Sequence, residues 1–232
     1  MTGLSGCAVS IGGLQHRTNS YTISRVTKLV VTDQAGDLTI IGGSSDAISV
    51  TEHISFHGTA PATTHRTAGG TLSLESNCPV AETCTVRYNI TAPRATALRV
   101  TDDAGAVTLG LLDGPVTVHV NAGRISLSSL AGPVDVTTSA GSISGQHLSA
   151  ASASLHVSAG GISATFTAPA TAISATTDVG AITLRVPGTV QYNVTASATV
   201  GNVHVAVSRG SSAAHQITAS TKTGSITIEP SA

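Results

Sequence analysis

Histidines are the residues of this 232-residue sequence best suited to binding a metal ion, and there are nine of them. Two, His119 and His156, occupy the same position of a repeated unit, four residues before a glycine, and Thr137 takes that position in the unit between them. Adjacent strands lie ~4.8 Å apart, which places these histidines about 10 Å from each other, too far to share one ion. His204 follows its glycine and is expected on a different face. The pattern favours solvent-facing histidines in strands and no metal site.

Carboxylates are the second group that could do chemistry, because polysaccharide lyases and hydrolases built on parallel β-helices need them on adjacent coils. Asp103 and Asp178 both lie two residues before a glycine. Their units are four steps apart, which is about 19 Å, whereas the carboxyl pair of a glycosidase needs roughly 5–9.5 Å. Asp102, Asp103 and Asp113 could converge on a cation, although the calcium-binding nonapeptide repeat is absent. We expect no catalytic residue, no metal ligand and no cofactor.

Cys78 and Cys84 bracket the sequence PVAE, a spacing at which a disulfide can close a loop between two strands. Two free thiols or a metal site are the alternatives, but no further Cys or His stands nearby at zinc-finger spacing. The disulfide is therefore favoured, and it indicates an oxidising compartment.

Cys7 ends the sequence LSGC (4–7), which resembles the bacterial lipobox, where a signal peptidase cuts before the cysteine and the thiol carries a diacylglyceryl group. Only six residues precede Cys7, so the charged and apolar regions of a signal peptide are missing. Either the true start lies upstream or the match is accidental, and we take the first as the expectation. The resemblance implies lipid attachment at Cys7 on the outer face of the cell membrane. Residues 1–24 would then be a lipobox remnant and flexible tether.

The composition excludes several classes of function. The chain is 41% hydrophobic, which is enough for a core, but only 10% charged with a formal net charge of -1, so no basic field could hold nucleic acid. Aromatic residues make up 2%, which leaves little for a stacking platform. No apolar run approaches the ~20 residues that cross a bilayer. Membrane contact is expected only through the lipid anchor.

A repeated unit determines the fold. Two residues after each of its glycines stands a β-branched residue, while the positions seven and five before are mostly aliphatic and those between them mostly Ser or Thr. Each unit therefore predicts two short strands with one apolar and one hydroxyl-rich face. The seven glycines are Gly105, Gly123, Gly141, Gly160, Gly180, Gly201 and Gly224, and an earlier copy lies at Gly36.

Units this short can bury an apolar face only by stacking, so the sequence predicts an all-β protein, a parallel β-solenoid (β-helix-like) of about seven to eight coils. The extra residues fall after the second strand, as in 185–193 and 206–216, which predicts loops on one edge. Between Gly36 and Gly105 the frame is lost. Strand-like runs at 47–56, 71–76 and 84–91, with a breaker-rich stretch at 57–70, predict an elaborated N-terminal β region within a single domain of residues 25–232. A separate small β domain is the alternative.

Residues 28–43, 86–123 and 182–205 resemble the bacterial "putative adhesin" family, a β-strand-repeat domain of unknown function in actinobacterial surface lipoproteins. The resemblance runs from about Arg25 to the C-terminus and implies a solenoid-like β fold at the cell surface, with no catalytic residue. We expect a non-enzymatic lipoprotein that contacts a glycan, a cell-wall polymer or a protein. Its regular outward column consists of Thr108, Ser126, Ser144, Ser163, Thr183 and Thr227, interrupted by His204.

Two alternatives stay open for the same columns and loops. A polysaccharide-active enzyme would have its site at the loop edge. Ice binding would use the Thr and Ser ladders, although Arg99, Asp135, His119 and His156 intrude on what should be a flat hydroxyl array.

Overall fold

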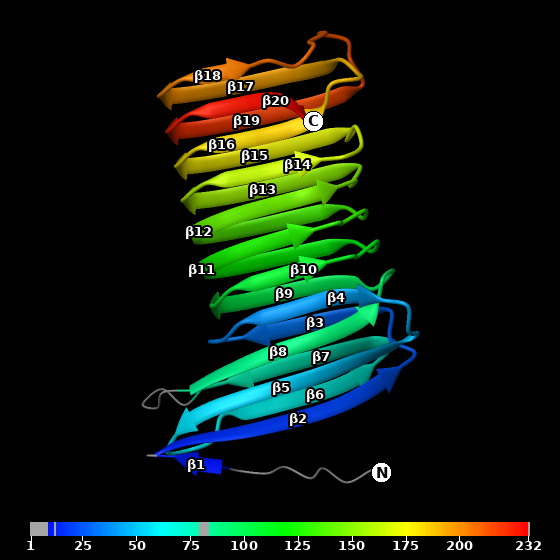
Figure 1. Cartoon of the computed structure of the whole chain (residues 1–232), viewed down its shortest axis with the longest axis vertical. Helices are drawn as coiled ribbons and strands as arrows, with labels where there is room; N and C mark the ends of the chain where they lie inside the picture. Colours follow the sequence, from blue (N-terminus) through cyan, green and yellow to red (C-terminus); the bar gives the residue numbers. More distant parts are fainter. Residues whose placement is uncertain (1–8, 12, 79–83, 232) are drawn as a thin grey trace.

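The computed structural model describes residues 9–11, 13–78 and 84–231, which form twenty strands (Figure 1). Strands stack along one long axis in two faces, and the chain passes from one face to the other at the repeated glycines. One strand on each face makes one coil of the stack. In the part of the chain that is described, no helix is long and apolar enough to cross a membrane.

The first face is ordered β6, β7, β3, β9, β11, β12, β13, β15, β19 and β17. All of its pairs are parallel except β6 with β7. Its strands are β6 (Ala62–Ala68), β7 (Thr71–Asn77), β3 (Lys28–Asp33), β9 (Ala97–Ala104), β11 (Val116–Ser128), β12 (Val134–Leu148), β13 (Ser152–Ala159), β15 (Ala172–Val179), β19 (His215–Thr223) and β17 (Tyr192–Val200).

The second face begins with antiparallel pairs of β1, β2, β5 and β8 and continues in parallel through β4 and β10 to β18. The long strands β11 and β12 turn the corner and contribute their second halves to it. The remaining strands are β1 (Val9–Ile11), β2 (Leu14–Ser24), β5 (Ala47–His57), β8 (Cys84–Pro93), β4 (Leu38–Gly43), β10 (Val107–Gly110), β14 (Ile162–Phe166), β16 (Ile182–Pro187), β20 (Ile226–Ser231) and β18 (Val203–Val205).

The apolar columns of the repeat form the core between the two faces, as predicted. Val118, Val136 and Leu155 are successive register partners on the first face, and Ile125 pairs with Ile143 on the second. Each of these side chains is at most 2% exposed. Burying one such aliphatic side chain contributes about 1.5–3 kcal/mol, so stacking stabilises coils that could not fold singly. The all-β, mostly parallel architecture is consistent with a β-solenoid-like fold.

The repeated glycines form one continuous column at the corner between the faces. A Cβ added to Gly123 would lie 1.8 Å from the carbonyl oxygen of Gly105, and one added to Gly141 would lie 1.8 Å from that of Gly123. Gly141 also has a φ of 145°, in the region that L side chains avoid, whereas Gly123 does not. Close approach of consecutive coils is therefore the constraint that all of these positions share.

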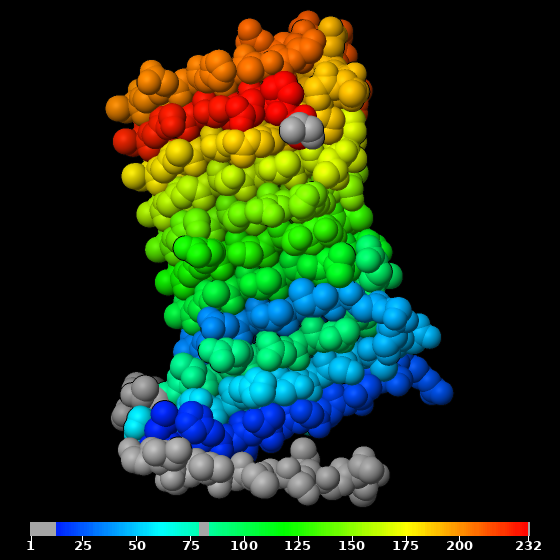
Figure 2. All heavy atoms as spheres, in the orientation of Figure 1, coloured from blue at the N-terminus to red at the C-terminus, as the bar shows by residue number. Residues whose placement is uncertain are grey.

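The order of coils in space differs from their order in the sequence at both ends of the stack. The last coil, β19 with β20, lies between β15 with β16 and β17 with β18 (Figures 1 and 2). In the glycine column, Gly224 accordingly contacts Gly180, and Gly201 contacts Gly224. Likewise β3 and β4 lie between β7 with β8 and β9 with β10. At these two places a unit therefore does not stack on the one before it in the sequence.

The N-terminal region contains the three predicted strands as β5, β7 and β8, and three that were not predicted, β1, β2 and β6. The tether expectation is wrong for residues 14–24, because β2 pairs with β5 along its whole length. Asn19 Nδ2 and Tyr21 Oη donate hydrogen bonds to the buried carboxylate of Glu52, at 3.0 and 2.7 Å. The breaker-rich stretch 57–70 contains β6. Cys7 lies outside the described residues.

Cys78 and Cys84 form the predicted disulfide, with their Cα atoms 5.8 Å apart. The bond connects the end of β7 on the first face to the start of β8 on the second. It therefore closes the coil that lies next to the antiparallel strands.

Candidate binding surface

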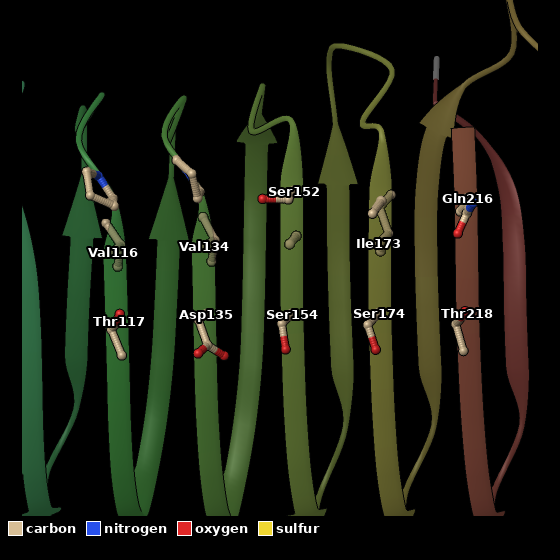
Figure 3. Close-up of a pocket in the computed structure, with 14 residues that line it drawn as sticks. Val116, Thr117, Val134, Asp135, Ser152, Ser154, Ile173, Ser174, Gln216 and Thr218 are labelled. Carbon is tan, nitrogen blue, oxygen red and sulfur yellow. The ribbon is translucent and has the colours of Figure 1, made fainter. Parts of the chain in front are cut away.

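A groove runs across the outer side of the first face, where five successive coils begin their strands (Figure 3). We call it the strand-start groove, and its volume is about 440 Å³. One row of register partners in its lining takes a hydrogen-bonding side chain from each of β11, β12, β13, β15 and β19. These five side chains are Thr117, Asp135, Ser154, Ser174 and Thr218.

The upper wall of this groove comes from the residues that lead into the strands. Pro115 and Pro133 precede β11 and β12, and Ser152 and Gln216 begin or nearly begin β13 and β19. Proline lacks an N–H and fixes its own φ, so it fits the entry of a strand. These residues raise one side of an otherwise flat face, and the result is a channel perpendicular to the strands.

A second groove of about 560 Å³ crosses the outer side of the second face. We call it the serine groove, after Ser126, Ser142, Ser144 and Ser163 in its lining. It holds the centre of the predicted hydroxyl column, and the register confirms that column from Thr108 to Thr227 with His204 at its end. Arg124 lies at one margin.

Both grooves are hydrogen-bonding surfaces with little charge. Asp135 is the one charged residue in the lining of the strand-start groove, and Arg124 is the one in the lining of the serine groove. Neither lining includes an aromatic side chain. Hydroxyl groups donate and accept equally well, so these surfaces suit a neutral ligand that itself carries hydroxyl groups.

The histidines lie as the sequence predicts. His119, Thr137 and His156 are consecutive register partners, so one coil separates the two histidines, and His204 lies on the second face. The Nδ1 atom of His156 is hydrogen-bonded to Thr176 Oγ1 at 3.0 Å. Among the described residues, no group of three or more His, Cys, Asp or Glu side chains is placed to hold a metal ion.

The three aspartates that could have met around a cation point in different directions. Asp102 is buried in the core, whereas Asp103 is exposed and accepts a hydrogen bond from Asn121 Nδ2 at 2.8 Å. Asp113 forms two hydrogen bonds with Arg94, at 2.8 and 3.1 Å, which lower the pKa of its carboxyl group. The convergence of Asp102, Asp103 and Asp113 is therefore excluded. Asp178 pairs with Lys222 at 2.9 Å, far along the stack from Asp103.

Asp102 belongs instead to a pair of buried acids that sequence reasoning missed. It is the register partner of Asp33 on β3, and the two residues are 0% and 2% exposed. Asp33 accepts a hydrogen bond from Ser76, and Asp102 from the N–H of Ala104, but the Oδ2 atom of each has no partner. Loss of hydration, followed by the charge of Asp33, raises the pKa of Asp102 to about 7, and loss of hydration also raises the pKa of Asp33.

The sequence predicted the outward side chains of the strand-start groove but not the groove itself. The alternation of Ser and Thr with aliphatic residues predicts its outward column, but that pattern is equally compatible with a flat surface. The signal that could have located the groove is the recurrence of Pro115 and Pro133 at the same position of adjacent units. Together with the outward column on the same strands, it indicates a raised margin.

Residues 94–229 match the model of the DUF4097 toastrack domain, and the chain therefore belongs to the DUF4097 toastrack family. No curated protein matches the chain. The resemblance predicted from the sequence is confirmed at the level of the family.

Solved structures from bacteria are similar to this chain, and the one from Bacteroides fragilis shares its fold. A "putative adhesin" from Bacteroides fragilis is 17% identical, with a TM-score of 0.53 over 93% of this chain and 97% of that one. A "putative adhesin" from Parabacteroides merdae is 11% identical, with a TM-score of 0.49 over 95% of this chain and 97% of that one. A "putative cell adhesion protein" from Clostridium sporogenes is 13% identical, with a TM-score of 0.40 over 93% and 100%.

Proposed function

We propose that this protein is a non-enzymatic binding module of the cell surface whose strand-start groove contacts a linear, neutral glycan of the cell envelope. The observation that carries the proposal is the row of five hydrogen-bonding side chains on five successive coils. Adjacent parallel strands repeat every ~4.8 Å, so the groove offers equivalent contacts at a regular interval. A linear glycan offers hydroxyl groups at a comparable regular interval along one direction.

The chemistry of the lining supports a polymer bound by many weak contacts. Each hydrogen bond contributes about 0.5–1.5 kcal/mol, and no aromatic ring in the lining adds stacking energy. Affinity would therefore depend on how many coils a ligand spans. The Asp135 carboxylate disfavours strongly acidic polymers, which is why we propose a neutral one.

The same lining argues for binding over cleavage. Hydrolysis of a glycosidic bond uses two carboxyl groups about 5–9.5 Å apart, and the groove is lined by the single carboxyl group of Asp135. This lining could hold a chain but lacks the acid and base pair that would cut it.

An extracytoplasmic location is part of the proposal. It is supported by the Cys78–Cys84 disulfide, which requires an oxidising compartment, and by the name "putative adhesin" of the Bacteroides fragilis structure that shares the fold. We propose that lipid on Cys7 anchors the single β domain to the outer face of the membrane. Expression with the upstream genomic sequence and labelling with a fatty acid tests this step, and Cys7→Ser should abolish the label. Equal labelling of that variant contradicts the anchor.

Binding is tested with a glycan array and with insoluble envelope polysaccharide in a pull-down assay. Ser154→Ala with Ser174→Ala removes two hydroxyl groups from the strand-start groove and should weaken binding about 30-fold, since each loss costs about 1 kcal/mol. Ser144→Ala with Ser163→Ala removes two from the serine groove and serves as the matched control. Binding that is reduced only in this control would move the site to the second face. Absence of any glycan binding contradicts the proposal.

A further inference from the structure

The coil formed by β17 and β18 ends the stack, and its outer edge has no strand partner among the described residues. Part of this edge is covered by the loop that follows β18. Tyr192 donates its N–H to the carbonyl of Ser208 and accepts a hydrogen bond from the N–H of Gly210, both at 3.0 Å. Beyond Tyr192 the described chain leaves the edge open.

The backbone of β17 shows which groups remain on this open edge. In a strand the N–H and C=O of alternate residues point to the same side. Because both groups of Tyr192 point away from β19, those of Val194, Ala196 and Ala198 point away as well. The carbonyl of Val200 turns back toward the stack and accepts from the N–H of Gly224 at 2.9 Å. The free hydrogen-bonding groups are therefore centred on Ala196 and Ala198.

The same end leaves the core uncovered. Val203 lies in the column that holds Ile125 and Ile143 in the interior, yet it is 42% exposed. Val200 is 62% exposed, and Val194 and Val205 are only partly buried. Natural proteins usually place charged residues at an exposed apolar sheet edge, because the charges prevent it from pairing with another chain.

The two strands at this end carry no such charges. Residues 189–208 contain no Lys, Arg, Asp or Glu, and the exposed Arg209 lies in the covering loop beside Tyr192, at the opposite end of β17 from Val200. At the opposite end of the stack, β2 and β6 carry Arg17 and Arg66. The two ends therefore differ, and the uncharged β17 edge could meet a copy of itself without repulsion between like charges.

We propose that two copies of this chain associate head to head through antiparallel pairing of their β17 edges. A two-fold axis at Ser197 places Ala196 opposite Ala198 of the second copy, and these residues exchange the N–H···O=C bonds that are free in one copy. The same register places Val194 opposite Val200, so apolar residues meet apolar ones. The exposed Thr195 and Thr199 meet on the outer side.

The size of this end is compatible with a reversible dimer. A strand of nine residues is about 30 Å long, and the two faces with their side chains are about 20 Å thick, giving on the order of 600 Å² per copy. Stable interfaces bury about 800 Å² per partner, so association in the micromolar range is expected.

Sedimentation velocity of the full chain, from about 1 to about 100 µM, tests the proposal. The mass should rise from 23.0 kDa toward twice that value. Ala196→Pro removes an N–H from the open edge without touching a bond to β19, and Val200→Lys places a charge in the interface. Each should weaken association at least about tenfold.

Val179→Lys is the matched control. Val179 holds the same corner position as Val200 and is 56% exposed, but its strand β15 has partners on both sides. This variant should dimerise like the original chain. If circular dichroism shows that Ala196→Pro does not fold, the test of the dimer rests on Val200→Lys alone. A monomer at every concentration, growth beyond two copies, or dimerisation unaffected by Val200→Lys overturns the proposal.

Discussion

Asp33 and Asp102 are direct register partners on β3 and β9, and both are buried in the core. Two carboxyl groups on neighbouring strands cannot both be charged in such a place without a large cost in free energy. The folded protein therefore retains a proton on this pair to a higher pH than the unfolded chain does.

Stability should consequently fall as the pH rises. The pKa of Asp102 is about 7 in the folded state and about 3.9 in an unfolded chain. Its protonation stabilises the fold fully below about pH 4, and that contribution is lost as the pH rises through 7, by at most about 1.4 kcal/mol per pH unit. Thermal melting between pH 4.5 and 8 should show this decline.

Asp102→Asn removes the charge and retains an acceptor for the N–H of Ala104. This variant should melt at a higher temperature than the original chain at pH 8 and should show a shallower dependence on pH. Asp135→Asn, at an exposed position, provides the control and should leave the dependence unchanged. Parallel melting curves for Asp102→Asn and the original chain would contradict the prediction.

Gly123→Ala should destabilise the protein by about 3 kcal/mol or more. The added Cβ would lie 1.8 Å from the carbonyl oxygen of Gly105, and neither coil can move without separating from the next. Urea unfolding gives the change in free energy. Gly161→Ala is the control, because its nearest contact is an oxygen at 3.3 Å, and its effect should stay within about 1 kcal/mol. If both variants unfold at similar urea concentrations, close contact between coils is not the cause of the destabilisation in Gly123→Ala.

Much of this fold could be predicted from sequence because each coil repeats the same constraints. The aliphatic columns at Val118 and Ile125 alternate with polar residues, most of them Ser or Thr, and this alternation determines which side faces the core. The order of the terminal coils could not be predicted in the same way. The spacings from Gly180 to Gly201 and from Gly201 to Gly224 are similar, and the aliphatic residues of either coil could pack on the coil that contains Gly180. The sequence therefore does not show which of the two coils lies next to it.

Strand β2 could not be predicted for a different reason. Its sequence lacks the apolar alternation that signals a half-buried strand, because polar side chains such as Asn19 are satisfied by the buried Glu52 from β5. Such a partner is visible only after folding. The same applies to the candidate site, whose outward Ser and Thr were predicted while the raised margin at Pro115 and Pro133 was not.

Ser129→Gly should stabilise the protein by about 1 kcal/mol. Ser129 has a φ of 54°, a conformation that costs a non-glycine residue roughly 1–2 kcal/mol and glycine very little. Thermal unfolding provides the measurement. Ser128→Gly, at the exposed end of β11, should destabilise by about 0.5–1 kcal/mol. If Ser129→Gly lowers the stability, the Ser129 side chain stabilises the fold by more than its backbone conformation costs.

Removing the disulfide should cost about 2 kcal/mol. Cys78 and Cys84 close a short loop, and the loss of entropy in the unfolded chain is correspondingly modest. The variant with Ser at both positions should unfold at lower urea concentration than the oxidised chain. Addition of a reductant should bring the original chain to the same midpoint and leave the variant unchanged. Equal midpoints without reductant would indicate that the bond contributes nothing.

The insertion of β19 and β20 beneath β17 and β18 has a consequence for how the molecule is made. A chain that emerges from the ribosome or an export channel in order cannot complete its stack progressively, because the coil that belongs in the gap appears after the coil that rests on it. Residues 192–205 must wait without their neighbour until residues 215–231 have emerged. A chain that stops before residue 215 therefore lacks the surface on which its own final strands rest.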